Sequence, residues 1–167
     1  MSLQSLFNAL ENTGWATAIR EGSIQFPAIE TVHVIAFATV VGAIAIVDLR
    51  LLGVLAHHRS VQRLTRELLP LTWGAFALAV ATGSLLFASN AVRYAGNPAF
   101  QLKFVVLALA GANMAAFHVG AFRHVDAWDE AERPPRAARF AGAASLALWI
   151  GVVAAGRFIG FIDPTGP

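Results

Sequence analysis

Glu30 and His33 are two ionisable side chains at the start of an apolar segment of the sequence. They stand one helical turn apart in the stretch ETVHVIAF at residues 30–37, and no further charge follows until Asp48. A neutral imidazole can ligate a metal ion or haem iron, and it can exchange hydrogen bonds with a bound molecule. Ionisable groups in apolar segments are costly unless they have a partner or a ligand, so both residues are candidates for a site.

Three other polar side chains are expected near the same depth. With Pro27 as the outer boundary of the first apolar segment, the rise of a helix places Glu30 about 5 Å and His33 about 9 Å inside. Arg157, near the end of the last apolar segment, falls about 7 Å below the same surface. A lysine opens the third segment on that side, and a tyrosine follows the second. The side chains expected to converge are Glu30, His33, Tyr94, Lys103 and Arg157.

Three interpretations of this group remain open. In the structural one, Glu30 pairs with Arg157, and His33 is hydrogen-bonded to a hydroxyl or an amide. In the second, His33 ligates the iron of haem b, while Arg157, Lys103 and Tyr94 bind the propionates at the aqueous edge. In the third, a quinone head group is held by His33, Glu30 and Arg157.

His118 is the other histidine well inside an apolar segment, and it is a weaker candidate metal ligand. The third segment runs inward from Lys103, so His118 is expected about 14 Å deeper than His33. The two histidines of one chain are therefore too far apart to ligate the same iron. A second axial ligand would have to come from His33 of a symmetry-related copy or from another subunit. Otherwise His118 is an interior hydrogen-bonding group.

Four apolar segments must position these residues. The 167-residue chain is 57% hydrophobic and only 13% charged, too apolar for an ordinary soluble fold. The segments lack the charged face that helices of a soluble bundle present to water. They predict an all-α integral membrane protein, an up-down-up-down four-helix bundle. The expected spans are 27–55, 68–92, 102–122 and 139–162.

The first 26 residues predict a separate amphipathic segment, followed by the bundle at 27–167. Leu3, Leu6, Phe7 and Leu10 recur at helical spacing, which is typical of a helix lying in the membrane interface. The segment lacks the basic start and continuous apolar run of a cleavable signal peptide.

Arginines predict the orientation. They concentrate in the loops at 56–67 and 123–139, whereas the connection at 90–103 has only one arginine and one lysine. By the positive-inside rule, the two arginine-rich loops face the cytoplasm and both termini are periplasmic. The sequence pI of 9.9 therefore reflects topology and does not imply a nucleic-acid partner. The sequence contains no cysteine, which excludes disulfides and thiolate metal sites.

Several phrases of the sequence resemble a bacterial family of small four-span membrane proteins, domain of unknown function 6644. They are HVIAFATVVGAIAIVDLRLLG, LPLTWGAFALAVATGSLLF, NPAFQLKFVVLALAGANMAAFH and AGRFIGF. The resemblance implies an inner-membrane protein and no established reaction. Its motif positions are His33, Asp48, Arg50, Lys103, Asn113, His118 and Arg157. A looser similarity, to copper-resistance D-like and cytochrome b-like four-helix membrane proteins, favours a redox or metal-linked role.

These observations favour a membrane subunit for electron transfer that binds haem b or a quinone near the periplasmic end. Such a subunit need not catalyse a reaction of its own, and the chain is not expected to be an enzyme. Its expected partners are the lipid bilayer and either a second copy of the chain or a redox subunit. The alternatives are a non-catalytic scaffold whose buried charges only stabilise the bundle, and a small ion or metal permease that acts as an oligomer.

Overall fold

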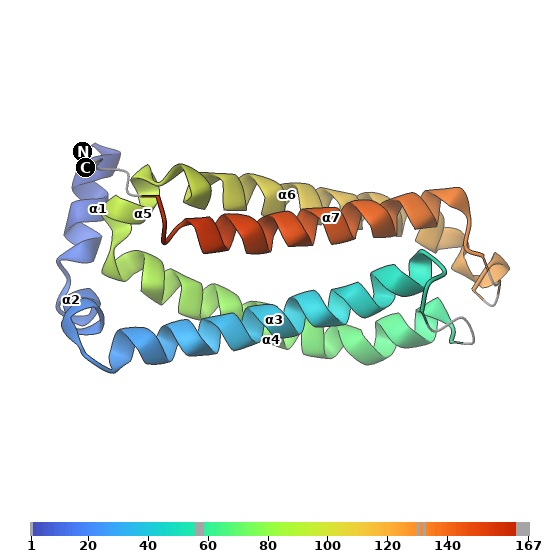
Figure 1. Cartoon of the computed structure of the whole chain (residues 1–167), viewed down its shortest axis with the longest axis horizontal. Helices are drawn as coiled ribbons and strands as arrows, with labels where there is room; N and C mark the ends of the chain where they lie inside the picture. Colours follow the sequence, from blue (N-terminus) through green and yellow to red (C-terminus); the bar gives the residue numbers. More distant parts are fainter. Residues whose placement is uncertain (1, 56–58, 130, 132, 163–167) are drawn as a thin grey trace.

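Four long antiparallel helices form the body of the protein (Figure 1). The computed structural model describes residues 2–55, 59–129, 131 and 133–162. Each long helix contains an 18-residue window with a mean hydropathy between 1.6 and 2.2, and each is long enough to cross a membrane. The predicted all-α, up-down-up-down bundle of a multi-pass membrane protein is therefore confirmed. The long helices are α3 (Gln25–Leu51), α4 (Val61–Ser89), α6 (Pro98–Val119) and α7 (Arg136–Phe158).

All four long helices begin and end before their expected limits, the second by the largest shift at its start. Helix α3 ends at Leu51, four residues early, and the chain turns through Gly53, whose φ of 73° suits a residue without a Cβ. Helix α4 begins at Val61, seven residues early. Pro70 consequently lies inside the helix.

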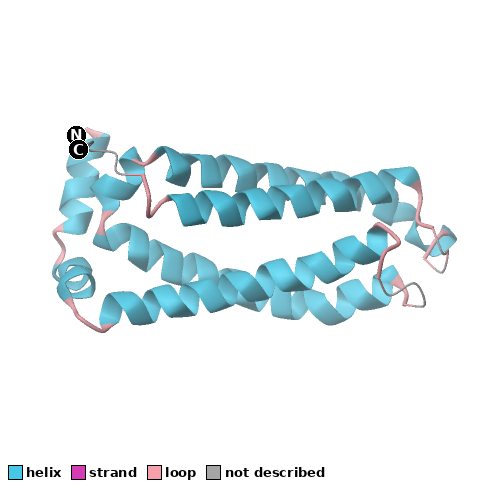
Figure 2. Cartoon of the chain, viewed as in Figure 1, coloured by secondary structure: helices cyan, strands magenta, loops and turns pink. Residues whose placement is uncertain are grey.

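The bundle of four long helices has two distinct ends. At one end lie both termini of the chain, together with α1 (Leu3–Glu11), α2 (Gly14–Glu21) and α5 (Ala91–Gly96) (Figure 1). We call it the terminal end. The opposite end holds the 3₁₀ helix η1 (Ala121–Ala127) and is called the arginine-rich end. Figure 2 shows that short loops join these helices.

The amphipathic segment before α3 forms two helices, α1 and α2. Helix α1 lies across the terminal end of the bundle (Figure 1). Its Leu3 and Leu6 side chains are exposed, while Phe7 packs edge-on against Phe87 of α4. The helical pattern of the first residues is thus confirmed, and their location in the membrane interface stays a prediction.

The bundle consists of two helical hairpins, α3–α4 and α6–α7. Helices pack closely within each hairpin, and α3 against α7 joins the two, whereas the backbones of α4 and α6 hardly approach each other. The central core contains Val40, Ala110, Trp149 and Val152. At the α3–α7 contact, a Cβ added to Gly142 would lie 3.1 Å from the carbonyl oxygen of Asp48. Only a residue without a side chain permits this approach.

Asn97 fastens the terminal end of the second hairpin. Its Oδ1 accepts hydrogen bonds from the first amides of α6, at Ala99 and Phe100. Its Nδ2 donates to the carbonyl oxygens of Ile159 and Ile162 at 3.1 and 2.8 Å. One buried amide therefore caps the start of α6 and satisfies carbonyls at the end of α7.

Asp129 caps α4 at the arginine-rich end. Its Oδ1 accepts from the amide of Val61 at 2.6 Å, and its Oδ2 accepts from the hydroxyl of Ser60. The side chain comes from the loop before α7, so a residue distant in sequence completes the first turn of α4. Ser60 is itself the N-cap of α4, with its hydroxyl accepting from the amide of Arg63 at 3.1 Å, so both residues explain why α4 starts earlier than its apolar pattern.

Arg50 of α3 forms hydrogen bonds with the loops that contain Arg59 and Asp129. The side chain is completely buried. Its Nε donates to the carbonyl oxygen of Arg59 at 2.7 Å, and its Nη2 donates to that of Asp129 at 3.0 Å. Backbone carbonyls thus replace water at Nε and Nη2, whereas the buried Nη1 has no hydrogen-bond partner among the described residues.

Candidate functional site

His33 is held between α3 and α4. Its Nδ1 lies 2.9 Å from the carbonyl oxygen of Ala79 and 3.1 Å from the hydroxyl oxygen of Thr82. Because a carbonyl can only accept, Nδ1 carries the proton, and in the neutral ring Nε2 keeps its lone pair. His33 is therefore bonded to a hydroxyl, as the structural interpretation expects, and it still has one nitrogen able to bind a ligand.

Lys103 extends this site from α6. The imidazole of His33 stacks on Phe37, with ring centroids 6.3 Å apart, and the Lys103 ammonium lies 5.3 Å from the centroid of the Phe37 ring. A Cβ added to Gly156 of α7 would lie 3.8 Å from Lys103 Nζ. The lysine charge also acts on His33. We call His33, Phe37 and Lys103 the histidine–lysine site; it draws on both hairpins.

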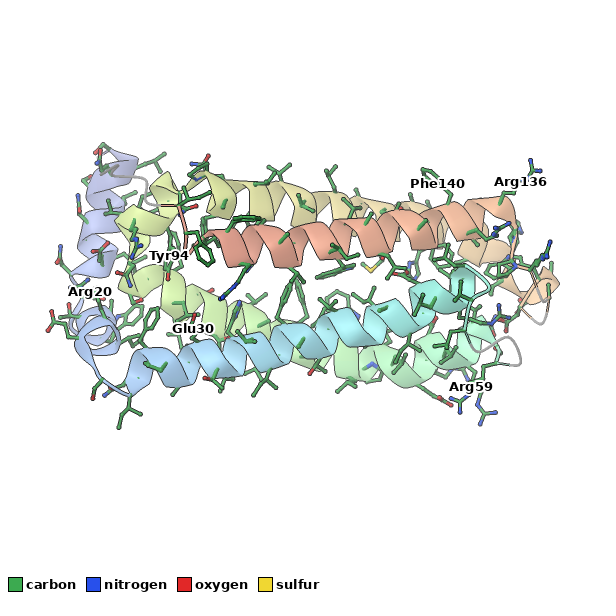
Figure 3. The ribbon with its side chains drawn as sticks, in the orientation of Figure 1. Arg20, Glu30, Arg59, Tyr94, Arg136 and Phe140 are labelled. Carbon is green, nitrogen blue, oxygen red and sulfur yellow. The ribbon has the colours of Figure 1, made fainter. Side chains whose placement is uncertain are left out.

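Glu30 and Tyr94 lie at the same end as the histidine–lysine site (Figure 3). The Glu30 carboxylate is exposed, and its charge acts on both His33 and Tyr94. Tyr94 belongs to α5, outside the long helices. Burial raises the pKa of its phenol, Glu30 raises that pKa further, and Arg93 opposes the shift. The phenol therefore stays neutral at physiological pH.

Arg157 contacts Phe161 and, in the described part of the chain, forms no hydrogen bond or ion pair with the histidine–lysine site. Its side chain is exposed, and the guanidinium carbon lies 5.4 Å from the centroid of the Phe161 ring. Among the described residues, Arg157 forms no ion pair with Glu30. The ion pair between Glu30 and Arg157 that the structural interpretation expects is therefore not formed between these described residues.

Aromatic side chains form a cluster around Tyr94 at the terminal end, and the sequence reasoning missed its phenylalanines. Phe100 of α6 stacks on Phe87 of α4 at a centroid distance of 5.4 Å and on Tyr94 at 5.7 Å. Phe104 packs edge-on against Phe100 at 4.9 Å. The phenylalanines at 100 and 104, one turn apart on either side of Lys103, were the available signal.

His118 lies at the opposite end of the bundle from His33. Its ring is exposed near the end of α6, and Nδ1 is 2.9 Å from the carbonyl oxygen of Met114. The 15 residues from Lys103 to His118 span about 22 Å of helix. The two histidines therefore cannot share one ligand within a chain. Across the described residues, no group of three His, Cys, Asp or Glu side chains could hold a metal ion.

The helices and the position of the polar site define a small multi-pass membrane protein. The chain belongs to the Family of unknown function (DUF6644), which it matches over residues 16–162. The resemblance seen in the sequence is thereby confirmed. No curated protein and no solved structure matches the chain.

Proposed function

We propose that the protein is an electron-transfer subunit of the membrane that binds a quinone head group at the histidine–lysine site. The observation that carries this proposal is the fixed tautomer of His33, whose Nδ1 donates to Ala79 at 2.9 Å. The remaining nitrogen, Nε2, can accept a hydrogen bond, and the Lys103 ammonium, whose charge acts on this ring, can donate one. A quinone–quinol pair needs both an acceptor and a donor.

The chemistry of these two side chains suits the head group. Oxidation of a quinol to a quinone releases two protons and two electrons. His33 Nε2 can accept one proton from a quinol hydroxyl, and the Lys103 ammonium can donate a hydrogen bond to a quinone oxygen. The second proton leaves to water at the terminal end. The proposal requires a partner redox protein to take the electrons.

A haem b is the second candidate ligand, and the hydrogen bond from His33 Nδ1 to the backbone favours it. Histidines that ligate metals commonly donate their other ring nitrogen to a backbone carbonyl, as Nδ1 does here. His118 cannot supply the second ligand, so six-coordinate iron would need His33 of a second copy or a partner subunit. Lys103 would then bind a propionate.

Ligand binding separates these proposals. Purified protein in nanodiscs is titrated with a short-chain quinone, and the rise in Tm is measured. Wild type is expected to bind, and His33→Ala and Lys103→Ala are each expected to weaken binding at least about tenfold, the loss of roughly 1.4 kcal/mol. Arg157→Ala is the matched control, because this exposed cation lies at the same end and outside the site.

An absorption spectrum of freshly purified protein tests the haem version. A Soret band that disappears in His33→Ala would establish haem and replace the quinone proposal. Equal quinone binding by wild type and both variants would refute the site. Colourless protein that binds no quinone would leave the scaffold alternative, in which the polar residues only stabilise the bundle.

The proposed setting is the bacterial inner membrane, with the terminal end in the periplasm. The arginines at the opposite end support this orientation. Reporter enzymes that are active on only one side of the membrane, fused after residue 162, give the test. Periplasmic activity is expected, and cytoplasmic activity would reverse the proposed orientation.

A further inference from the structure

Asp48 is a buried carboxyl group that the proposed function does not use. It lies three residues before the end of α3 at the arginine-rich end, and only 5% of its surface is exposed. Its Oδ2 has no hydrogen-bond partner among the described residues. A buried ionised carboxylate with an unsatisfied oxygen is expensive, whereas the neutral acid costs far less.

Ser145 lies beside this carboxyl, and Asn113 lies at the neighbouring stretch of α7. Ser145 of α7 places its hydroxyl against Asp48. The Nδ2 of Asn113, from α6, donates to the carbonyl oxygen of Ala141 at 3.0 Å. That carbonyl belongs to the residue immediately before Gly142, where the backbone of α7 lies against Asp48 of α3. The bond through Nδ2 leaves Asn113 Oδ1 able to accept a hydrogen bond.

The charged groups near this end are directed elsewhere. On α3, the Arg50 guanidinium donates to backbone carbonyls of the loops. On α7, Arg136 and Arg139 are exposed, and on α6 the exposed His118 ring is bonded within its own helix. In the described part of the chain, Asp48 therefore has no cation within ion-pair distance to neutralise its charge.

We propose that Asp48, Asn113 and Ser145 form a proton-binding site, with Asp48 as a neutral carboxylic acid in the folded protein. The acid O–H donates to Asn113 Oδ1, and the acid oxygen accepts from the Ser145 hydroxyl. No bond other than O–H is made or broken. From the helical rise, Asp48 is about 5 Å from the end of α3, so its proton exchanges with water at the arginine-rich end.

Infrared spectroscopy tests the protonation state. Wild-type protein in nanodiscs at pH 7 is expected to show a carboxylic acid C=O band that Asp48→Asn removes. Ser145→Ala should shift the frequency of the same band, because it removes a hydrogen bond to the acid. Glu67→Gln, which changes an exposed carboxylate at the same end, should leave the band unchanged.

The pH dependence of unfolding gives an independent readout. If the folded protein holds a proton that the unfolded chain releases, the free energy of unfolding falls as pH rises. Asp48→Asn, which mimics the neutral acid, should weaken that slope, and Glu67→Gln should not. Absence of the acid band in wild type, or a stabilisation that depends on Na⁺ and not on pH, would overturn the proposal. These tests hold if Asp48→Asn fails to fold, because wild type and Ser145→Ala still report the band.

Discussion

Gly83 of α4 lies directly against His33 of α3. A Cβ added to Gly83 would lie 3.0 Å from His33 Cε1 and 3.4 Å from Nδ1, tighter than ordinary van der Waals contact. The imidazole, which is held by the carbonyl oxygen of Ala79, would have to shift. This glycine therefore sets the position of the histidine and, in the proposed function, the direction of Nε2.

Gly83→Ala is expected to weaken quinone binding several-fold, because the displaced imidazole no longer presents Nε2 to the ligand. Gly74→Ala on the same helix is the control, since a Cβ there meets no atom within 4 Å. Binding is measured by the ligand-dependent rise in Tm. Equal affinity in the two variants would contradict the role of Gly83.

Tyr94 offers a direct probe of the terminal end, because it is the only tyrosine in the sequence. Burial and the Glu30 carboxylate raise the pKa of its phenol. An ultraviolet titration should therefore give a pKa above the ordinary value of about 10. Glu30→Gln should lower that pKa, whereas Glu67→Gln at the opposite end should not change it.

The sign of the pH effect follows from the raised pKa of Tyr94. Below about pH 10 the phenol is protonated in both the folded and unfolded states, and it contributes no pH dependence. Above that pH the unfolded chain loses its proton first, so the free energy of unfolding falls until the folded protein ionises too. Tyr94→Phe should remove this part of the alkaline destabilisation. An unchanged alkaline transition would refute the coupling.

Asn97→Ala should destabilise the protein by about 2–3 kcal/mol. It removes an N-cap and leaves the carbonyl oxygens of Ile159 and Ile162 without their donor. Unfolding in a titration with denaturing detergent measures the loss. Gln101→Ala provides the comparison, because that exposed amide bonds only to Ala95 nearby. Similar unfolding curves for the two variants would show that Asn97 is dispensable.

Arg50→Lys should cost about 2–3 kcal/mol, because an ammonium cannot reach the separate carbonyls that Nε and Nη2 bind. The same substitution at Arg63, exposed and paired with Glu67 at 3.1 Å, should change stability by less than about 0.5 kcal/mol. Thermal unfolding in nanodiscs compares the two. A small effect at Arg50 would show that the loops are held by other contacts.

The fold could be predicted because membrane spans depend on local composition. Apolar segments without a charged face predicted the helices α3, α4, α6 and α7. They did not predict the residues at which these helices begin and end. Helix α4 starts at Val61 because the hydroxyl of its N-cap, Ser60, accepts from the amide of Arg63, and because Asp129 accepts from the amide of Val61. Ser60 was an available signal in the sequence, whereas the contribution of Asp129, a residue distant in sequence, leaves no signal in the periodicity of α4.

The depth of the polar residues could also be predicted, but not the directions of their side chains. Helical rise places Glu30, His33, Lys103 and Arg157 near one end, where the structure has them. It does not determine helix rotation, which packing sets. Arg157 consequently lies over Phe161 and, among the described residues, forms no ion pair with Glu30, whereas Lys103 reaches the ring of Phe37.

The backbones of α4 and α6 hardly approach each other, and this has a consequence for how the protein is inserted into the membrane. Each hairpin already supplies every long helix with a neighbour, so the translocon can release the chain as two preassembled pairs that dock later through α3 and α7. Co-expressed fragments 1–96 and 97–167 should then reassemble in the membrane and co-purify. Fragments that stay apart would show that the peptide linkage, rather than the contact of α3 with α7, holds the halves together.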